Sequence, residues 1–229
     1  MKRTELMVRL DNAIATRNLL RHPFYRDWQA GTLSRERLQL YAAQYYLHVE
    51  AFPVHLKVLA RRANGALREI ILENLAEEEN PAAPHPKLWR DFADAVGVSE
   101  EALWTSVPLP GTRVLVETYR EICRSKPFAE AVASLYAYEA QVPEIAATKM
   151  DGLRRHYGVK TPQGVAYFEV HEEADRIHRA AWRRWLEKRD RGSVGTTSGD
   201  VDEDQVLATA ETALDALWGA LDAVQEARC

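Results

Sequence analysis

His171, Asp175 and His178 are the residues whose types and spacing point most directly to chemistry, and all three lie in the run YFEVHEEADRIHRAAW. On an α-helix, which turns by about 100° per residue, offsets of four and seven bring these side chains within roughly 60° of arc. Two imidazoles and a carboxylate on one face suit non-haem iron or another divalent first-row metal. The alternative is an ordinary solvated helix face, because charged residues such as Glu173 surround the three.

Two further segments supply polar groups that would complete such a site. In ILENLAEEENPAAPHPKLW, the glutamates at 77–79 end a helical pattern before two prolines, and His85 begins the next helix. In SLYAYEAQVPEIAATKM, Glu139 lies among Ala, Leu, Tyr and Val, where a carboxylate is costly unless it is paired or coordinated. The alternatives are a solvated helix end for 77–79 and an ion pair with Arg62 or Arg124 for Glu139.

Other metal centres are less favoured by the sequence. The two Glu-x-x-His motifs of ferritin-type sites do not occur in it. Haem needs an axial histidine opposite a wide apolar slot, and His22 precedes a proline at a helix break. We expect His48 and His55, which are seven residues apart, to be hydrogen-bonded histidines of the core or the surface.

The elements that must position these groups are helices. Almost every long segment has helical periodicity and no alternating run reaches strand length, so the predicted fold class is all-α. Ser34, Pro127 and Pro162 mark expected helix starts, and Pro53 and Pro143 are expected to kink the helices that contain them. The predicted helices cover about 4–20, 34–62, 66–79, 85–96, 112–123, 128–157, 162–189 and 202–226.

The chain of 229 residues, 46% of them hydrophobic, is long enough for one helical domain with a sizeable core. We therefore expect a single domain over 1–229. The stretch RDRGSVGTTSGDVDED at about 189–204 is rich in Gly, Ser, Thr and Asp, which predicts a mobile connector before the last helix.

Charge and cysteine content limit the classes of partner. The net charge of −4 gives no basic field for nucleic acid or an anionic membrane. Cys123 and Cys229 are the only cysteines, which excludes a disulfide framework. Charged residues interrupt the apolar run of the first 20 residues, so we expect neither a signal peptide nor a membrane span, and hence a cytoplasmic protein.

These segments together resemble the haem-oxygenase-like (TenA/PqqC-like) diiron oxidases, and within them the Chlamydia protein associating with death domains and its bacterial relatives that make para-aminobenzoate. The resemblance runs from about residue 10 to residue 187, through HPFYRDW, LQLYAAQYYLHVEAFP, NLAEEEN, YAYEAQVPEIAATK and YFEVHEEADRIH. It implies a helical bundle of seven to eight helices. The connector and the last helix match weakly, and the resemblance does not carry over death-domain binding, a role of the chlamydial member alone.

The resemblance also implies a ligand set and co-substrates. Two metal ions, Fe/Fe or Fe/Mn, would be held by six residues, and O2 and an electron donor would be consumed. The implied ligands are Glu78, His85, Glu139, His171, Asp175 and His178.

Family members of the para-aminobenzoate type look like self-consuming enzymes. A tyrosine of the protein itself supplies the aromatic ring of the product, and a lysine is implicated as the amino donor. The matching positions here are Tyr25 and Lys149, with Tyr41 as a second redox-active tyrosine. Without the resemblance, Lys149 would be interpreted as a surface lysine.

Three hypotheses follow. The first is an oxygen-dependent dimetal oxidase that makes para-aminobenzoate for folate from its own tyrosine. The second is a diiron oxidase of the same scaffold that acts on a free amino acid, a lipid or a cofactor precursor. The third is a non-enzymatic helical interaction protein, and homodimer formation is left open for all three.

Overall fold

The protein is described here by a computed structural model, which covers residues 5–190 and 202–228. Within these ranges it contains eleven α-helices, one short 3-10 helix and no strand, which confirms the all-α prediction. The elements are α1 (Glu5–Thr16), η1 (Leu19–Arg21), α2 (Pro23–Ala30), α3 (Arg35–Arg62), α4 (Gly65–Glu78), α5 (His85–Ala95), α6 (Glu100–Trp104), α7 (Pro110–Ser125), α8 (Phe128–Glu139), α9 (Val142–His156), α10 (Pro162–Asp190) and α11 (Glu203–Glu226).

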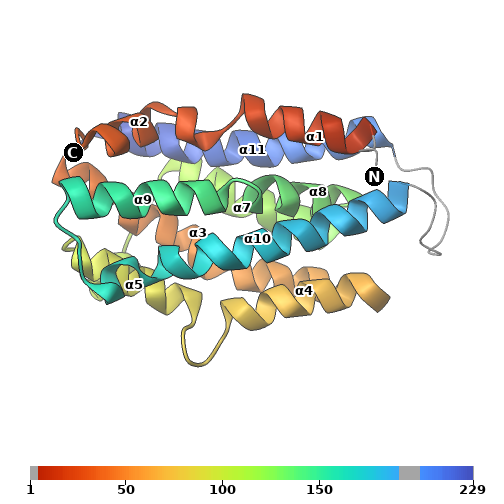
Figure 1. The fold of residues 1–229 in the computed structure, drawn as a ribbon, viewed down its shortest axis with the longest axis horizontal. Helices are drawn as coiled ribbons and strands as arrows, with labels where there is room; N and C mark the ends of the chain where they lie inside the picture. The colour runs from red at the N-terminus through yellow and green to blue at the C-terminus, as the bar shows by residue number, and fades with distance from the viewer. Residues whose placement is uncertain (1–4, 191–201, 229) are drawn as a thin grey trace.

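Most long helices run roughly along the long axis of a bundle (Figure 1). α11 packs on α7 and α8, α10 packs on α5, α8 and α9, and α3 packs on α4, α5 and α7. α8 is buried from Ala129 to Glu139, because Ala, Leu, Tyr and Val surround its axis on all sides. α8 therefore carries the Glu139 carboxylate into the middle of the bundle.

Several predicted helix boundaries are confirmed. Ser34 precedes α3, and its side-chain oxygen accepts a hydrogen bond from the backbone N–H of Arg37. Pro162 is the first residue of α10, and Pro53 lies inside α3 as predicted. These caps fix where α3 and α10, two helices that border the candidate site, begin.

The single helix predicted over 128–157 is wrong. α8 ends at Glu139 and α9 begins at Val142, so Pro143 lies in the first turn of a new helix and does not kink a continuous one. A proline is tolerated there because first-turn N–H groups have no intrahelical acceptor. The helix predicted over 4–20 ends at Thr16 and is followed by η1, while the short helices α2 and α6 were not predicted.

The predicted connector at 189–204 is shorter in the structure, because α10 continues to Asp190 and α11 begins at Glu203. The rest of it, residues 191–201, lies outside the described residues. None of the described helices is both long and apolar enough to span a membrane.

Candidate metal centre

The six predicted ligand residues come together as two groups of three buried side chains. Within each group, one potential ligand atom per residue lies within 4.8 Å of the others. The first group is Glu78, His85 and His171, and the second group is Glu139, Asp175 and His178.

α10 contributes to both groups. His171, Asp175 and His178 are 5%, 4% and 7% exposed, so the predicted common face exists and points into the bundle. The solvated-face alternative is therefore wrong. The structure divides the three residues between the groups, because His171 lies one helical turn before Asp175.

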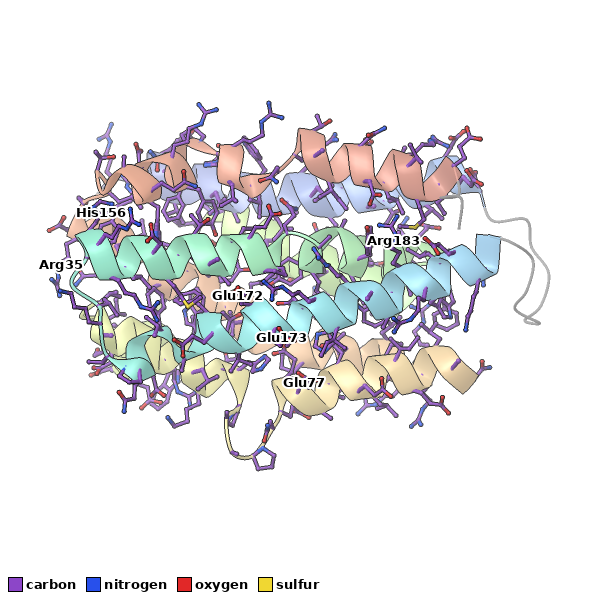
Figure 2. All side chains as sticks on the ribbon, viewed as in Figure 1. Arg35, Glu77, His156, Glu172, Glu173 and Arg183 are labelled. Atoms are coloured by element: carbon purple, nitrogen blue, oxygen red, sulfur yellow. The ribbon has the colours of Figure 1, made fainter. Side chains whose placement is uncertain are left out.

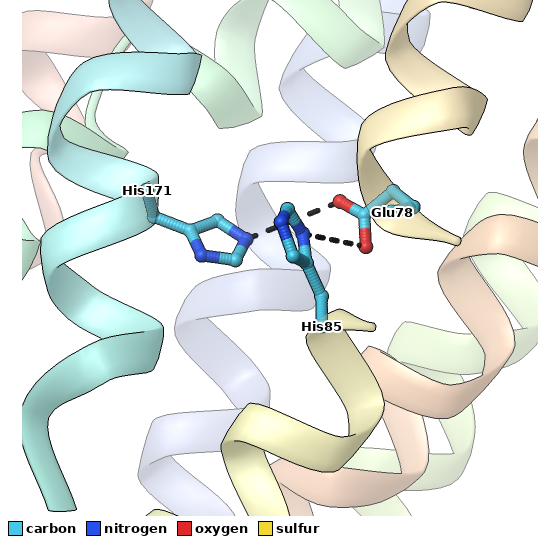
Figure 3. A group of neighbouring side chains, drawn as sticks. All are labelled: Glu78, His85 and His171. Carbon is cyan, nitrogen blue, oxygen red and sulfur yellow. Dashed lines mark ion pairs between the residues drawn. The ribbon is translucent and has the colours of Figure 1, made fainter. Parts of the chain in front are cut away.

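The first group joins the end of α4, the start of α5 and α10 (Figure 3). Nδ1 of His85 lies 3.0 Å from Oε2 of Glu78, and Nε2 of His171 lies 3.9 Å from Oε1 of Glu78. Nδ1 of His171 donates to the Tyr167 carbonyl at 2.7 Å, so Nε2 keeps its lone pair. Burial, together with the neighbouring His85, lowers the pKa of His171 well below its usual value and keeps the imidazole in its neutral, metal-binding form.

The second group is organised around Glu139, which is 1% exposed. Its two carboxylate oxygens accept hydrogen bonds from Nδ2 of Asn74 at 2.8 Å and from Nε1 of Trp182 at 2.5 Å. Burial and the nearby Asp175 together raise the pKa of Glu139 to about 8, although His178 and the hydrogen bonds from Asn74 and Trp182 act in the opposite direction. Without a cation, this carboxyl is therefore largely protonated at neutral pH.

Three buried atoms in these groups have no hydrogen-bond partner among the described residues. They are Nδ1 of His85, Oδ2 of Asp175 and Nε2 of His178. His85 Nδ1 lies close to Glu78 but at an angle unsuited to a hydrogen bond. An unsatisfied buried polar atom costs about 1–3 kcal/mol, and a metal ion in each group would satisfy all three. Imidazole and carboxylate ligands without thiolate suit iron or manganese, so the donor set fits the metals that the family resemblance implies.

The alternative ion pairs for Glu139 are wrong. Arg62 donates to two backbone carbonyls at the end of α7, and Arg124 pairs with Glu121 at 2.7 Å. The solvated-helix-end alternative for 77–79 holds for two of the three glutamates. Glu78 is buried, whereas its two neighbours are exposed.

The second candidate region, which we call the tyrosine–lysine chamber, consists of Tyr25, Tyr41 and Lys149. Lys149 is 4% exposed, and its Nζ donates to the Tyr41 hydroxyl at 2.6 Å. The Tyr25 hydroxyl lies 3.5 Å from that of Tyr41. The surface-lysine interpretation of Lys149 is therefore wrong.

Aromatic rings surround the amine of Lys149. The ring centroids lie 5.0–5.6 Å from Nζ and belong to Tyr25, Tyr41, Tyr45, Trp89 and Phe168. Burial lowers the pKa of Lys149 to about 7, because the low-dielectric surroundings penalise the ammonium form. Burial also raises the pKa of Tyr25 and Tyr41, so both phenols stay protonated.

A small cavity lies between the chamber and His171 of the first ligand group. Its volume is about 30 Å³, and its lining includes Tyr25, Tyr41, Lys149 and His171. A cavity of this size holds a water molecule or a diatomic gas. His171 is therefore common to the ligand groups and to the wall of the chamber.

Trp182 and Asn74, which donate hydrogen bonds to Glu139, were not predicted, although the helical periodicity of the sequence indicates both. Trp182 follows His178 by four residues on α10, and Asn74 precedes Glu78 by four on α4. Side chains four residues apart share a helix face. Extending the helix face that carries the ligands by one turn, on α10 and on α4, therefore identifies the two residues that donate to Glu139.

The remaining histidines do not join the ligand groups. His22 caps α2 by accepting from the N–H of Phe24, and its Nε2 lies 2.9 Å from Asp222. His48 is fully buried, but neither of its ring nitrogens has a hydrogen-bond partner among the described residues, so its expected hydrogen bond is absent. Burial lowers the pKa of His48 to about 3, which keeps this imidazole neutral.

Comparisons with known proteins agree with this geometry. A family profile described as iron-containing redox enzyme matches residues 39–218. A Nitrosomonas europaea protein described as 4-aminobenzoate synthase is 39% identical over 96% of this chain and 91% of its own length. A Chlamydia muridarum protein with the same description is 37% identical over 95% of this chain and 89% of its own length.

The fold also matches a solved structure. A TenA homolog from Pseudomonas syringae pv. tomato superposes with a TM-score of 0.82, covering 99% of both chains at 17% sequence identity. At that identity the match shows a shared fold alone.

Proposed function

The chain belongs to the family of iron-containing redox enzymes, and from this premise we propose that it is an oxygen-dependent dimetal oxidase that makes 4-aminobenzoate (para-aminobenzoate) for folate from its own Tyr25. Two relatives described as 4-aminobenzoate synthase match it over nearly the whole chain. Those descriptions name the product. The tyrosine–lysine chamber supports the proposal that Tyr25 supplies the aromatic ring.

In this proposal the first and second groups hold two metal ions, Fe/Fe or Fe/Mn. Bound iron would supply electrons for the activation of O2, and an external electron donor would restore them. His171 and the other imidazoles bind as neutral ligands, while the carboxylates balance the cationic charge. The bundle excludes bulk water from both groups, which limits side reactions of a strong oxidant.

The observation that carries the proposal is the enclosed contact of Lys149 with Tyr25 and Tyr41 beside His171. In tyrosine, the hydroxyl is para to Cβ, just as the amine is para to the carboxylate in 4-aminobenzoate. Conversion needs oxidation of Cβ to a carboxylate, cleavage of the Cα–Cβ bond and replacement of the phenol oxygen by nitrogen. O2 with the electron donor supplies the oxidation. Lys149 supplies the nitrogen, which requires that its Nζ–Cε bond breaks and that the phenol oxygen leaves as water.

Lys149 is suited to that role by its burial. A nitrogen nucleophile needs a lone pair, and the pKa of about 7 leaves much of the amine neutral at neutral pH. The hydrogen bond to Tyr41 holds Nζ within the ring of aromatic side chains, 5.6 Å from the centroid of Tyr25. Lys149 therefore lies beside the ring that the proposal consumes.

The size of the cavity favours an internal ring over an external substrate. The cavity measures about 30 Å³. Benzene alone occupies an engineered cavity of roughly 150 Å³. A free aromatic amino acid would require a large opening of the bundle, whereas Tyr25 is already in place.

The test is to trace the ring. Protein expressed with ring-labelled tyrosine is loaded with iron and then given reductant and O2 without any added aromatic compound. We expect labelled 4-aminobenzoate at no more than one equivalent per chain, together with loss of mass from the Tyr25 peptide. Matched protein without label, given free labelled tyrosine, should release unlabelled product.

Many turnovers per chain, or label that enters the product from free tyrosine, would contradict the internal source. Either result would favour the second hypothesis, in which the same metal centre oxidises a small molecule taken from solution.

A further inference from the structure

Glu77 is a carboxylate that the six-residue ligand set leaves out. Its side chain is 46% exposed, and its Oε1 lies 3.8 Å from Nε2 of His178. His178 is only 7% exposed, and this Nε2 has no hydrogen-bond partner among the described residues. Glu77 therefore links solvent to an unpartnered, buried metal-binding atom.

Basic residues hold neighbouring exposed carboxylates but not this one. Glu79 pairs with Lys57 at 2.5 Å, and Glu173 pairs with Arg176 at 3.4 Å. In the described part of the chain, no lysine or arginine lies within ion-pair distance of Glu77. Figure 2 labels Glu77 near the end of α4 and Glu173 on α10, which packs against α4. The Glu77 carboxylate is thus available to a cation from solvent.

The end of α4 directs consecutive carboxylates to different ligand groups. Glu78 contacts His85 of the first group, and Glu77 contacts His178 of the second group. Two ligand atoms bound to one ion at about 2.0–2.2 Å each lie roughly 3–4 Å apart. The 3.8 Å between Glu77 and His178 fits a shared ion without movement of the backbone.

The inner ligands of the second group are less accessible than Glu77. Glu139 and Asp175 are 1% and 4% exposed, so an ion from solvent must first lose water to residues nearer the surface. His178 lies within the second group and also within reach of Glu77. It can hold an ion at both stages.

We propose that Glu77 is the residue through which a divalent iron ion reaches the second group. The ion binds first between Glu77 and His178, then moves inward to Asp175 and Glu139, and Glu77 returns to solvent. This inference rests on the proposed metal-binding role of the second group. Glu77 is thus proposed to bind iron only during its entry and not to be a ligand once the second group holds the ion.

The test is the rate of metal uptake by metal-free protein. Fe²⁺ is added without O2, and bound iron is followed over time by quenching samples with a coloured chelator. We expect Glu77→Gln to slow uptake by about tenfold, because a carboxylate on the path raises the local cation concentration. Final iron content should still reach that of the unmodified protein, since all six ligands remain. The matched controls are Glu79→Gln and Glu173→Gln, which should take up iron at the normal rate.

Each outcome discriminates. An unchanged rate in Glu77→Gln, or an equal slowing in Glu79→Gln, would overturn the inference, since the pairing with His178 would then have no special role. A lower final iron content in Glu77→Gln would also overturn it, because Glu77 would then be a permanent ligand. If the unmodified protein bound no iron, the proposed metal centre itself would fail, and that result is separate from the first three.

Discussion

The two ligand groups and the tyrosine–lysine chamber are equally buried, yet their polar atoms are satisfied in opposite ways. In the ligand groups, buried atoms of His85, Asp175 and His178 have no hydrogen-bond partner in the described residues. In the chamber, the amine of Lys149 and the hydroxyl of Tyr41 satisfy each other at 2.6 Å.

This difference shows which region needs a ligand. Unpaired buried polar atoms are costly, and in the ligand groups, unlike at His48, they lie within 4.8 Å of other donor atoms, so a cation in each group would satisfy them. The chamber is complete as folded, which agrees with the proposal that its substrate is part of the chain. Metal binding and consumption of the chamber should therefore be separable by mutation.

The largest expected effect is on product formation by Tyr25→Phe. This substitution removes the phenol oxygen that the nitrogen would replace on the ring, so we expect no 4-aminobenzoate. Iron content should be unchanged, because Tyr25 lies in the chamber and not in either ligand group. Product is measured by mass spectrometry and iron by elemental analysis.

The matched control for Tyr25→Phe is Tyr46→Phe. Tyr46 is also a buried tyrosine, 1% exposed, but its hydroxyl bonds to Glu50 and it does not line the cavity. It should still yield product. Product from Tyr25→Phe at the normal level would show that the ring comes from elsewhere.

The next largest effect is expected from variants of the metal ligands, which should lose iron as well as product. His171→Ala or Glu139→Ala removes one of three ligands from a group, and we expect iron content to fall to about one ion per chain or less. Product should be lost with it, while the circular dichroism of the helices stays unchanged. His156→Ala, which removes an exposed histidine of α9, is the control and should load normally. Full iron content in both site variants would contradict the ligand assignment.

A smaller effect is expected from pH. Glu139 has a pKa raised to about 8, so a metal that binds it must displace a proton at lower pH. Iron affinity of the metal-free protein should therefore rise by at least about tenfold per pH unit between pH 6 and pH 8, and more steeply wherever Asp175, whose pKa is also raised by burial and by Glu78, releases a second proton. His171 adds no such dependence, because its lowered pKa already leaves it neutral. Titration with Fe²⁺ without O2 measures the slope, and a flat profile over this range would exclude a protonated Glu139.

Sequence reasoning found the helical class and the faces of α10 and α8, because helical periodicity and a lone carboxylate among apolar residues are local signals. It could not divide the α10 ligands between two groups, since that depends on how α4, α5 and α8 pack around α10. The choice of Glu78 within 77–79 and the roles of Tyr25, Tyr41 and Lys149 came from the family resemblance. The break before Pro143 was missed because a proline fits the first turn of a helix as well as a kink.

The smallest effect concerns the turn between α4 and α5, which carries two ligands of the first group. Here the difference between the ligand groups and the chamber should appear as a change in backbone mobility when metal binds. Glu78 ends α4 and His85 begins α5, with residues 79–84 between them. Backbone hydrogen bonds within this turn are few and local, such as that from the Ala83 N–H to the Asn80 carbonyl. Between the two helix ends themselves, the chain is joined by this turn and by the pair of Glu78 and His85, while both helices pack on α3 and α10.

A metal ion bound by both side chains would close the turn, since its binding free energy offsets the chain entropy lost there. We expect hydrogen exchange over 77–90 to slow by several-fold when iron is added without O2. The buried positions of α11 between Val206 and Val224 include no proposed ligand, so their exchange should change little and they serve as the internal reference. Equal protection of 77–90 in both forms would mean that packing alone orders the turn, and that the first group is as complete without metal as the tyrosine–lysine chamber.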